Sequence, residues 1–329
     1  MISVIIPTRN RAAVLEEALD SIAEQRLRPD AYEVIVVDNG STDNTPDVVA
    51  AAEAKLPNMR YILEQEPGLH AGRHRGLQEA SGELLTFADD DIEALPSWLE
   101  SVLEGFSDPH VVMVGGNNLP RFLEPPPRWL RVLWEKPNLG GQAIPALSIL
   151  ELPGGARLCN PMYVWGCNFS IRKSALLAAG GFHPDSLPQE LILFRGDGET
   201  HVSRYVMQSG GKCLFHPGVS VYHKVSPERM SISYFRKRAF NQGISDSYSE
   251  LRGKYFDHHG RGRFVRLGGV HRRVRKLYRQ VRSACMRDQD LKLLFTESAT
   301  GYEEGFSCHQ HAFATDPEIH DWVLKPCYL

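Results

Sequence analysis

The nine residues TFADDDIEA, from Thr86 to Ala94, place three consecutive carboxylates directly after the apolar run ELLTFA. Carboxylates this close repel one another, and one of them can be forced to stay protonated. A hard divalent cation such as Mg²⁺ or Mn²⁺ would remove the repulsion, because it binds carboxylate oxygens together with substrate phosphates. A solvated acidic turn before a helix that opens near Pro96 explains the same residues. The surrounding sequence has to decide between a metal site and a turn.

Apolar runs and helical patterns alternate on both sides of this stretch, from the N-terminus to about residue 116. The strand-like runs are SVIIP, YEVIVVD, MRYILE, ELLTFA and VVMVGG, and a helical pattern follows each of the first four, the third helix stopping at Gly82. This alternation predicts a mostly parallel sheet that helices cover on both faces. Such sheets bind ligands at the carboxyl ends of their strands, where Asp38 and Asp89 both lie. The loop after the first strand, PTRNR, lacks the GxGxxG of a dinucleotide-binding fold.

The rest of the chain is less regular. Residues 121–141, RFLEPPPRWLRVLWEKPNLGG, are interpreted as an ordered insertion or loop, and residues 165–182 as a strand and turn before a helix. DGETHVSRYVMQSGG predicts a helix stopped by Gly210, and KCLFHPGVSVYHKV predicts a short hairpin. Residues 261–287 are dense in arginine, with apolar residues at helical spacing. We therefore predict an α/β domain over residues 1–245 and a basic helical extension over residues 246–329.

Composition narrows the class of protein. The 329 residues are 42% hydrophobic and 23% charged, as in ordinary soluble globular proteins, and the formal net charge of -3 does not indicate a partner. The six cysteines are scattered and none has CxxC spacing, so neither a zinc site nor a disulfide framework is indicated. The first apolar run is short and lacks a basic region before it, and no run has the length of a transmembrane helix. We expect a cytoplasmic protein.

Six motifs, in this order, resemble glycosyltransferase family 2, the inverting nucleotide-sugar transferases with the GT-A fold. VIIPTRNR is similar to the family's first strand and base-binding loop, and VIVVDNGSTDNT to its second strand and turn. GLHAGRHRGL is similar to its Ala-Arg-Asn segment, and LLTFADDDI to the strand with the DxD motif. WGCNFSIRKSALLAAGGF resembles the acceptor-side loop and helix, and GDGETHVSRYVMQSGG the helix with the catalytic carboxylate. The resemblance covers about Ile2 to Gly243 and implies a Rossmann-like GT-A fold with a C-terminal helical extension.

The resemblance implies a donor site at the first three motifs. Asp38 would bind the nucleotide base, and a carboxylate can accept from a ring N–H of uracil or guanine. Asp38 is also explained as a turn residue that caps the next helix. Arg73 would lie near the diphosphate, whereas His74 replaces the family's usual Asn. The residues implied to line the nucleotide-sugar site are Pro7, Thr8, Arg9, Asp38, Gly40, Arg73, Asp89 and Asp90.

A metal site would explain the carboxylate triplet. By the resemblance, Asp89 faces the ribose and the metal, and Asp91 is the direct ligand of Mn²⁺ or Mg²⁺. His223 stands where some members supply a further ligand, although a lone His is more often structural. A divalent ion neutralises the charge that builds on the departing nucleoside diphosphate.

An inverting transfer needs a base to deprotonate the attacking hydroxyl group. The family usually carries Glu-Asp at the start of this helix, and here the run is GDGET. Counting back from Gly210 places Glu199 at the Asp position, and Asp197 is the competitor, more simply explained as a helix N-cap. The residues expected to border the acceptor are Trp165, Gly166 and Asn168.

The sequence leaves three functions open. The first is a metal-dependent transferase that uses a UDP-sugar, or second a GDP-sugar, with a glycan, lipid-linked or small-molecule hydroxyl acceptor. The second is a nucleotide-sugar-binding module without turnover, which the altered GDGET motif keeps open. The third is a nucleotidyltransferase, which would need a Gly-rich phosphate loop that PTRNR does not provide. Residues 261–287 read either as a solvated helix packed on the domain or as a peripheral contact with the inner face of a membrane. No recognition motif indicates nucleic acid.

Overall fold

Two sheets position the functional residues in the computed structural model, which describes residues 1–256 and 288–329. An eight-stranded sheet has the order β11-β13-β6-β12-β4-β1-β2-β3, and a six-stranded sheet has the order β5-β14-β7-β10-β9-β8. The strands of the larger sheet are β1 (Ile2–Thr8), β2 (Tyr32–Asp38), β3 (Met59–Leu63), β4 (Leu84–Ala88), β6 (Val111–Gly115), β11 (Arg157–Leu158), β12 (Asn168–Arg172) and β13 (Lys212–Phe215). Those of the smaller sheet are β5 (Ile92–Ala94), β7 (Asn118–Phe122), β8 (Pro137–Asn138), β9 (Gly141–Ile144), β10 (Ile149–Glu151) and β14 (Val221–Val225).

The larger sheet confirms the predicted parallel α/β architecture. β1 pairs in parallel with β2 and β4, and β2 with β3, whereas β12 runs antiparallel between β4 and β6. All seven residues of β1 and of β2 are buried, as expected where both faces of a sheet are covered. The helices that follow these strands are α1 (Ala12–Ala23), α2 (Thr45–Ala52), α3 (Leu69–Glu79), α4 (Trp98–Gly105), α6 (Lys173–Ala178) and α7 (Glu199–Ser209).

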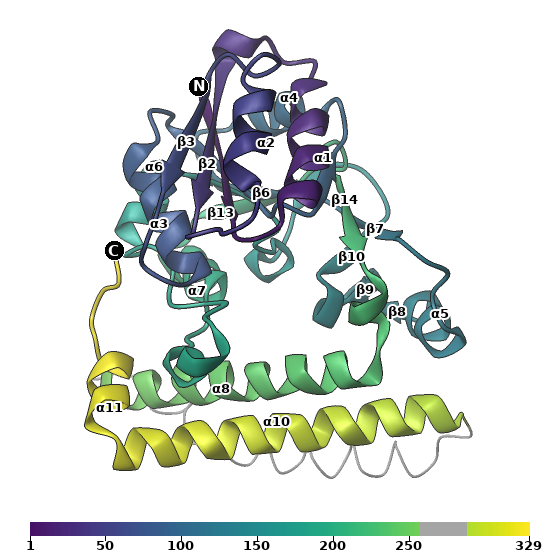
Figure 1. Ribbon diagram of the computed structural model, residues 1–329, viewed down its shortest axis with the longest axis vertical. Coiled ribbons are helices and arrows are strands. Elements are labelled where there is room, and N and C mark those ends of the chain that lie inside the picture. The colour runs from purple at the N-terminus through teal and green to yellow at the C-terminus, as the bar shows by residue number, and fades with distance from the viewer. Residues whose placement is uncertain (257–287) are drawn as a thin grey trace.

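Helices cover both faces of the larger sheet (Figure 1), and two apolar clusters hold them against it. Alternate residues of β1 point to opposite faces. Ile2, Val4 and Ile6 pack in one cluster with side chains of α1, α2 and α4. Ile5 packs in the other with side chains of α3, α6 and α7. The carboxyl ends of β1, β2 and β4 are thereby held at one edge.

Two local predictions need correction. The stretch 212–225 is not a hairpin, because β13 pairs with β6 in the larger sheet while β14 pairs with β5 and β7 in the smaller one. The chain crosses between the sheets at the turn His216–Val219, and each strand finds a non-local partner. α3 ends at Glu79, so Gly82 lies beyond it. The ordered insertion of residues 121–141 holds α5 (Arg128–Glu135).

The C-terminal region is helical, as predicted. α8 (Ile232–Phe256) and α10 (Gln289–Thr315) lie side by side below the sheets and run in the same direction, and α11 (Pro317–Val323) follows (Figure 1). They approach closely at glycines: a Cβ on Gly243 would lie 2.2 Å from Tyr302 O, and one on Gly305 would lie 2.0 Å from Phe240 O. The predicted boundary between residues 245 and 246 falls inside α8. The arginine-rich segment 261–287 lies outside the described residues.

The described part of the chain has no helix that is both long enough and apolar enough to span a bilayer. The remaining short elements are the 3-10 turns η1 (Pro29–Ala31), η2 (Pro145–Leu147), η3 (Pro161–Tyr163), η4 (Gln189–Phe194) and η5 (Pro227–Met230).

Candidate active site

A pocket of about 330 Å³ opens at the carboxyl ends of β1 and β4. It includes five of the residues that the sequence assigns to the nucleotide-sugar site. Arg11, Asn39, the start of α3 and the turn 186–188 complete it and were not predicted, although Arg11 belongs to the PTRNR loop. The pocket is lined by Pro7, Thr8, Arg9, Arg11, Asn39, Gly68, Leu69, Asp89, Asp90, Ser186, Leu187 and Pro188.

Asp38 lies at the end of β2, beside this pocket but outside its lining. Its buried carboxylate accepts hydrogen bonds from the backbone N–H of Ser41 at 2.7 Å and from the Tyr61 hydroxyl at 2.6 Å. Burial, followed by the bond to this carboxylate, raises the pKa of Tyr61 above its usual value, so the hydroxyl stays a donor. Gly40 has a φ of +76° and shapes the turn that follows. Each carboxylate oxygen has a second acceptor position, so Asp38 retains capacity for a further donor.

Asp90 is held from two sides beneath the pocket. Its carboxylate accepts from the Thr8 hydroxyl at 2.7 Å and from an Arg11 guanidinium N–H. Burial raises the pKa of Asp90 to about 7, and the Asp89 and Asp91 charges act in the same direction, against the guanidinium of Arg11. Of the three adjacent carboxylates, the central Asp90 is therefore the one whose pKa is raised, as expected from the sequence for one of them.

Asp91 has different partners from Asp90, apart from the shared Arg11. Its Oδ2 accepts from Arg11 at 2.8 Å and from Arg229 of η5 at 3.0 Å. Although burial by itself raises the pKa of Asp91, His223 and the two guanidinium groups more than offset it and hold the pKa well below its usual range. The sequence alone does not predict a role for Arg229, because nothing in the sequence PERM of η5 indicates a contact with Asp91.

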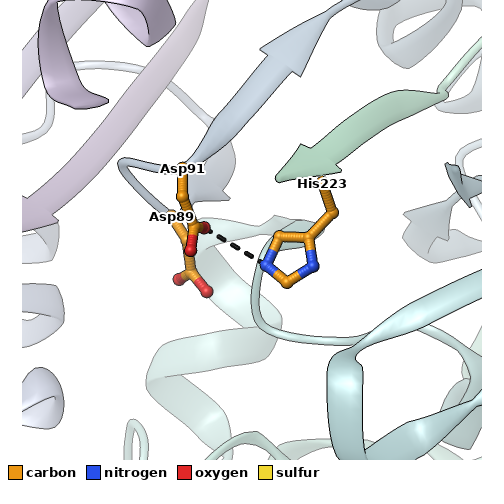
Figure 2. Close-up of side chains that lie close together, drawn as sticks. All are labelled: Asp89, Asp91 and His223. Atoms are coloured by element: carbon orange, nitrogen blue, oxygen red, sulfur yellow. Dashed lines mark ion pairs between the residues drawn. The ribbon is translucent and has the colours of Figure 1, made fainter. Parts of the chain in front are cut away.

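Figure 2 shows the side chains of Asp89, Asp91 and His223 gathered at this turn. Each can offer one ligand atom, and these atoms lie within 4.8 Å of one another. Asp91 Oδ1 is buried and lies 3.2 Å from His223 Nε2. A proton on Nε2 would pair with this oxygen, and a divalent ion bound by both atoms would take the place of that proton. Two carboxylates and an imidazole also match the donors that Mn²⁺ accepts. The residues present therefore fit a divalent ion.

A buried arginine connects this cluster to the next functional element. Arg73 of α3 is 2% exposed, and its guanidinium group lies over the Phe182 ring. One of its nitrogens is 3.6 Å from Asp89 Oδ1, and another is 3.6 Å from Glu199 Oε2. Glu199 also accepts from the backbone N–H of Gly166 at 3.2 Å. The structure thus brings four of the sequence-predicted residues together.

Glu199 begins α7, and Gly210 ends it in a left-handed conformation, as the counting predicted. The helix begins with Gly198 at its N-cap position and no side-chain cap, so the predicted N-cap role of Asp197 is wrong. The Asp197 carboxylate instead turns to His183 at 2.6 Å, to Ser249 of α8 at 2.8 Å, and to Arg204. Although burial opposes it, these contacts hold the pKa of Asp197 below its usual range. Asp197 therefore joins α7 to α8.

His74 stands where the resemblance led us to expect Asn, and the structure shows which contact the imidazole makes there. Its Nε2 accepts a hydrogen bond from the backbone N–H of Phe182 at 2.8 Å. Burial lowers the pKa of His74 to about 4, so the ring is neutral and free to accept at neutral pH. His74 therefore supports the loop that carries Phe182 under Arg73.

The acceptor-side residues differ in their surroundings. Gly166 packs against Arg73 so closely that an added Cβ would lie 2.3 Å from a guanidinium nitrogen. Trp165 is partly buried and donates from its indole N–H to Met162 O at 3.0 Å. Asn168 accepts from the Trp98 indole and donates to Val219 O, both at 3.0 Å, inside the protein. Asn168 therefore ties elements together inside the protein.

The model of one protein family, described as glycosyl transferase family 2, matches residues 3–177. Glycosyltransferase AglE of Haloferax volcanii is 36% identical over 117 residues, which are 35% of this chain and 38% of that protein. Validoxylamine A glucosyltransferase of Streptomyces hygroscopicus subsp. limoneus is 29% identical over 201 residues, 56% of this chain and 44% of that protein. The chain thus spans less than half the length of these relatives.

The fold also matches a solved structure. The mannosyltransferase PcManGT from Pyrobaculum calidifontis, in complex with GDP-Man and Mn²⁺, superposes with a TM-score of 0.53 over 98% of this chain and 78% of that one. Sequence identity is 19%, so the similarity establishes the GT-A fold.

Proposed function

The chain belongs to glycosyltransferase family 2, and from this we propose that it transfers a sugar, with inversion, from a nucleoside diphosphate donor to an acceptor hydroxyl group. The observation that carries the proposal is the arrangement around Arg73. A carboxylate–imidazole cluster that fits a divalent ion lies on one side of this arginine, and Glu199 lies on the other. Leaving-group stabilisation and proton abstraction need charges of these two kinds near one reacting carbon.

The donor would occupy the pocket between β1, β4 and the turn 186–188. We assign the base to the end of β2, where Asp38 would accept from a ring N–H, and the ribose to Asp89. This favours a UDP-sugar, with a GDP-sugar second, because both bases carry such a donor. Arg73, which lies 3.6 Å from Asp89 Oδ1, would contact the diphosphate.

Asp89, Asp91 and His223 would hold Mn²⁺ or Mg²⁺. The ion would supply Lewis-acid neutralisation of the charge on the departing diphosphate. Arg11 and Arg229 hold Asp91 from the Oδ2 side, which leaves Oδ1 turned toward His223. These residues thereby orient the ligand oxygen before any donor binds.

Glu199 is our candidate for the base. Its side chain is 24% exposed, compared with 5% for Asp197, so only Glu199 is accessible to an acceptor hydroxyl group. Arg73 and the Gly166 N–H fix its direction. Trp165 and Gly166 would border the acceptor, which we expect to be a glycan, a lipid-linked sugar or a small molecule.

Binding and hydrolysis of a panel of nucleotide sugars in the presence of Mn²⁺ test this function. We expect saturable binding of one UDP- or GDP-sugar and slow release of its nucleoside diphosphate. Binding without turnover toward water or any supplied acceptor would instead identify a nucleotide-sugar-binding module. Release of pyrophosphate from a nucleoside triphosphate and a sugar phosphate would identify a nucleotidyltransferase.

A further inference from the structure

Two cysteines lie opposite each other at the edge of the larger sheet. Cys159 directly follows β11, and Cys213 is the second residue of β13, so the antiparallel register of these strands sets them face to face. The backbone N–H of Cys159 donates to Cys213 O at 2.9 Å. Their Sγ atoms are 3.5 Å apart, and both residues are free thiols. Neither residue belongs to the candidate active site.

The positions of Cys159 and Cys213 are compatible with a disulfide bond between them. Residues directly opposite on antiparallel strands have Cα atoms about 4.5–5.5 Å apart, and disulfides span about 4.4–6.8 Å between Cα atoms. Small side-chain rotations are therefore sufficient to bring the sulfurs together, and the backbone pairing stays intact.

The two thiols differ in the way that thiol–disulfide exchange requires. Cys213 is 3% exposed, whereas Cys159 is partly exposed between exposed neighbours. The contact with Cys213, together with the Arg157 charge, lowers the pKa of the Cys159 thiol against the effect of burial. The same contact and burial raise the pKa of the Cys213 thiol. Because the thiolate is the attacking species, Cys159 reacts first.

We propose that Cys159 and Cys213 form a reversible redox clasp between β11 and β13. The Cys159 thiolate attacks a low-molecular-weight disulfide such as oxidised glutathione, forms a mixed disulfide and releases one thiolate, which takes up the proton that Cys159 lost. Cys213 then loses its proton and attacks Cys159 Sγ, which expels the second small thiol. Two protein thiols are oxidised, one external disulfide is reduced to two thiols, and all protons are accounted for.

The clasp would restrain the loop that leads to the candidate active site. Residues 159–167 connect β11 to β12, and Pro161 O in this loop accepts from the Ser203 hydroxyl of α7 at 3.2 Å. Gly166, near the end of this loop, donates from its N–H to Glu199. Fixing Cys159 to β13 therefore removes freedom at the start of this loop.

Peptide mapping of the full chain tests the clasp. Reduced protein is incubated with oxidised glutathione, blocked with N-ethylmaleimide and digested without reductant. We expect a peptide that links Cys159 to Cys213 and that dithiothreitol separates. Cys213→Ser should accumulate glutathione on Cys159, because the resolving thiol is gone, whereas Cys159→Ser should leave Cys213 reduced. Cys308→Ser, which removes an exposed thiol on α10, should form the link like the wild type.

Physical measurements on the same oxidised wild-type sample give a second readout. We expect the melting temperature to rise by roughly 5 °C, because the bond closes a long loop in the unfolded chain. Amide exchange in residues 157–166 should slow, and dithiothreitol should reverse both effects. The proposal is overturned if both thiols still react with N-ethylmaleimide after oxidation, or if Cys159 keeps glutathione in the wild type. It is also overturned if the disulfide-linked protein exchanges these amides as fast as the dithiol protein does.

Discussion

At the scale of single residues, the structure gives Glu199 and Asp197 different surroundings, and we therefore expect different roles for them. Two carboxylates lie two positions apart, yet one faces Arg73 and Gly166 while the other is enclosed by His183, Ser249 and Arg204. The intervening Gly198 has a φ of +53°, and this left-handed residue turns the chain between them.

Glu199→Gln should lower sugar transfer by about 10²–10⁴-fold, the usual cost of losing a general base. The amide keeps the size of the side chain and can still accept from the Gly166 N–H. Nucleotide and metal affinity should therefore stay close to wild type. The measurement is a steady-state rate together with calorimetry on the same variant.

Asp197→Asn is the matched control for that substitution. It weakens the hydrogen bonds to His183, Ser249 and Arg204, so it should cost about 1–3 kcal/mol of unfolding free energy, the usual penalty for buried polar groups left unpaired. The rate per folded molecule should be nearly normal. Equal losses of rate in both variants, or a normal rate in Glu199→Gln, would assign the base elsewhere.

Asp38→Ala should weaken nucleotide binding by roughly 1.5–3 kcal/mol, the contribution of a hydrogen bond to a charged group. Tyr61→Phe controls for the native bonds of Asp38, because it removes one of them and leaves the carboxylate in place. We expect that control to bind nucleotide nearly as well as wild type. Calorimetry that finds unchanged affinity of Asp38→Ala for both UDP and GDP would refute the base contact.

At the scale of elements, sequence periodicity was sufficient to predict the positions of the helices and strands that follow a regular pattern. β1, β2 and α7 lie where their apolar runs and glycine stops indicate. The predicted hairpin at 212–225 failed because strand pairing is a non-local choice: residues 212–215 and 221–225 read as neighbours but join different sheets. Arg11 and Arg229 were missed for a related reason, since a charged side chain carries no sequence signal for its partner.

The packing of α8 against α10 should depend on pH through His309. This side chain is fully buried, contacts the Ser247 hydroxyl at 2.8 Å, and has a pKa that burial lowers to about 4. The unfolded chain binds the proton near pH 6.5, so the unfolding free energy falls as the pH drops from 6.5 toward 4, by roughly 3 kcal/mol for this group. Denaturant titrations across this range measure the slope.

His309→Gln is the comparison for that slope. The amide can still bond the Ser247 hydroxyl but does not titrate, so the variant should lose less stability than wild type between pH 6.5 and 4. His70, His74 and His201, whose pKa values burial also lowers to about 4, contribute equally to both proteins. Parallel pH profiles for the two proteins would show that His309 does not titrate in this range.

At the scale of the whole molecule, the candidate metal site lies at the junction of the two sheets. The carboxylate triplet connects β4 of the larger sheet to β5 of the smaller one, and His223 comes from β14 of the smaller sheet. The sequence could place the triplet at the end of a strand. It could not show that His223 lies opposite Asp91, because the two residues meet only when the smaller sheet has formed. The division into residues 1–245 and 246–329 remains a prediction.

The central claim is that the Asp89–Asp91–His223 cluster binds a divalent ion needed to use a nucleotide-sugar donor. The most direct measurement is Mn²⁺-dependent release of nucleoside diphosphate from the best-binding donor, for wild type and Asp91→Asn. We predict release by the wild type that EDTA abolishes and added Mn²⁺ restores, and loss of most of the activity in Asp91→Asn at every Mn²⁺ concentration. Full wild-type activity in excess EDTA, or a normal rate for Asp91→Asn, would contradict the account.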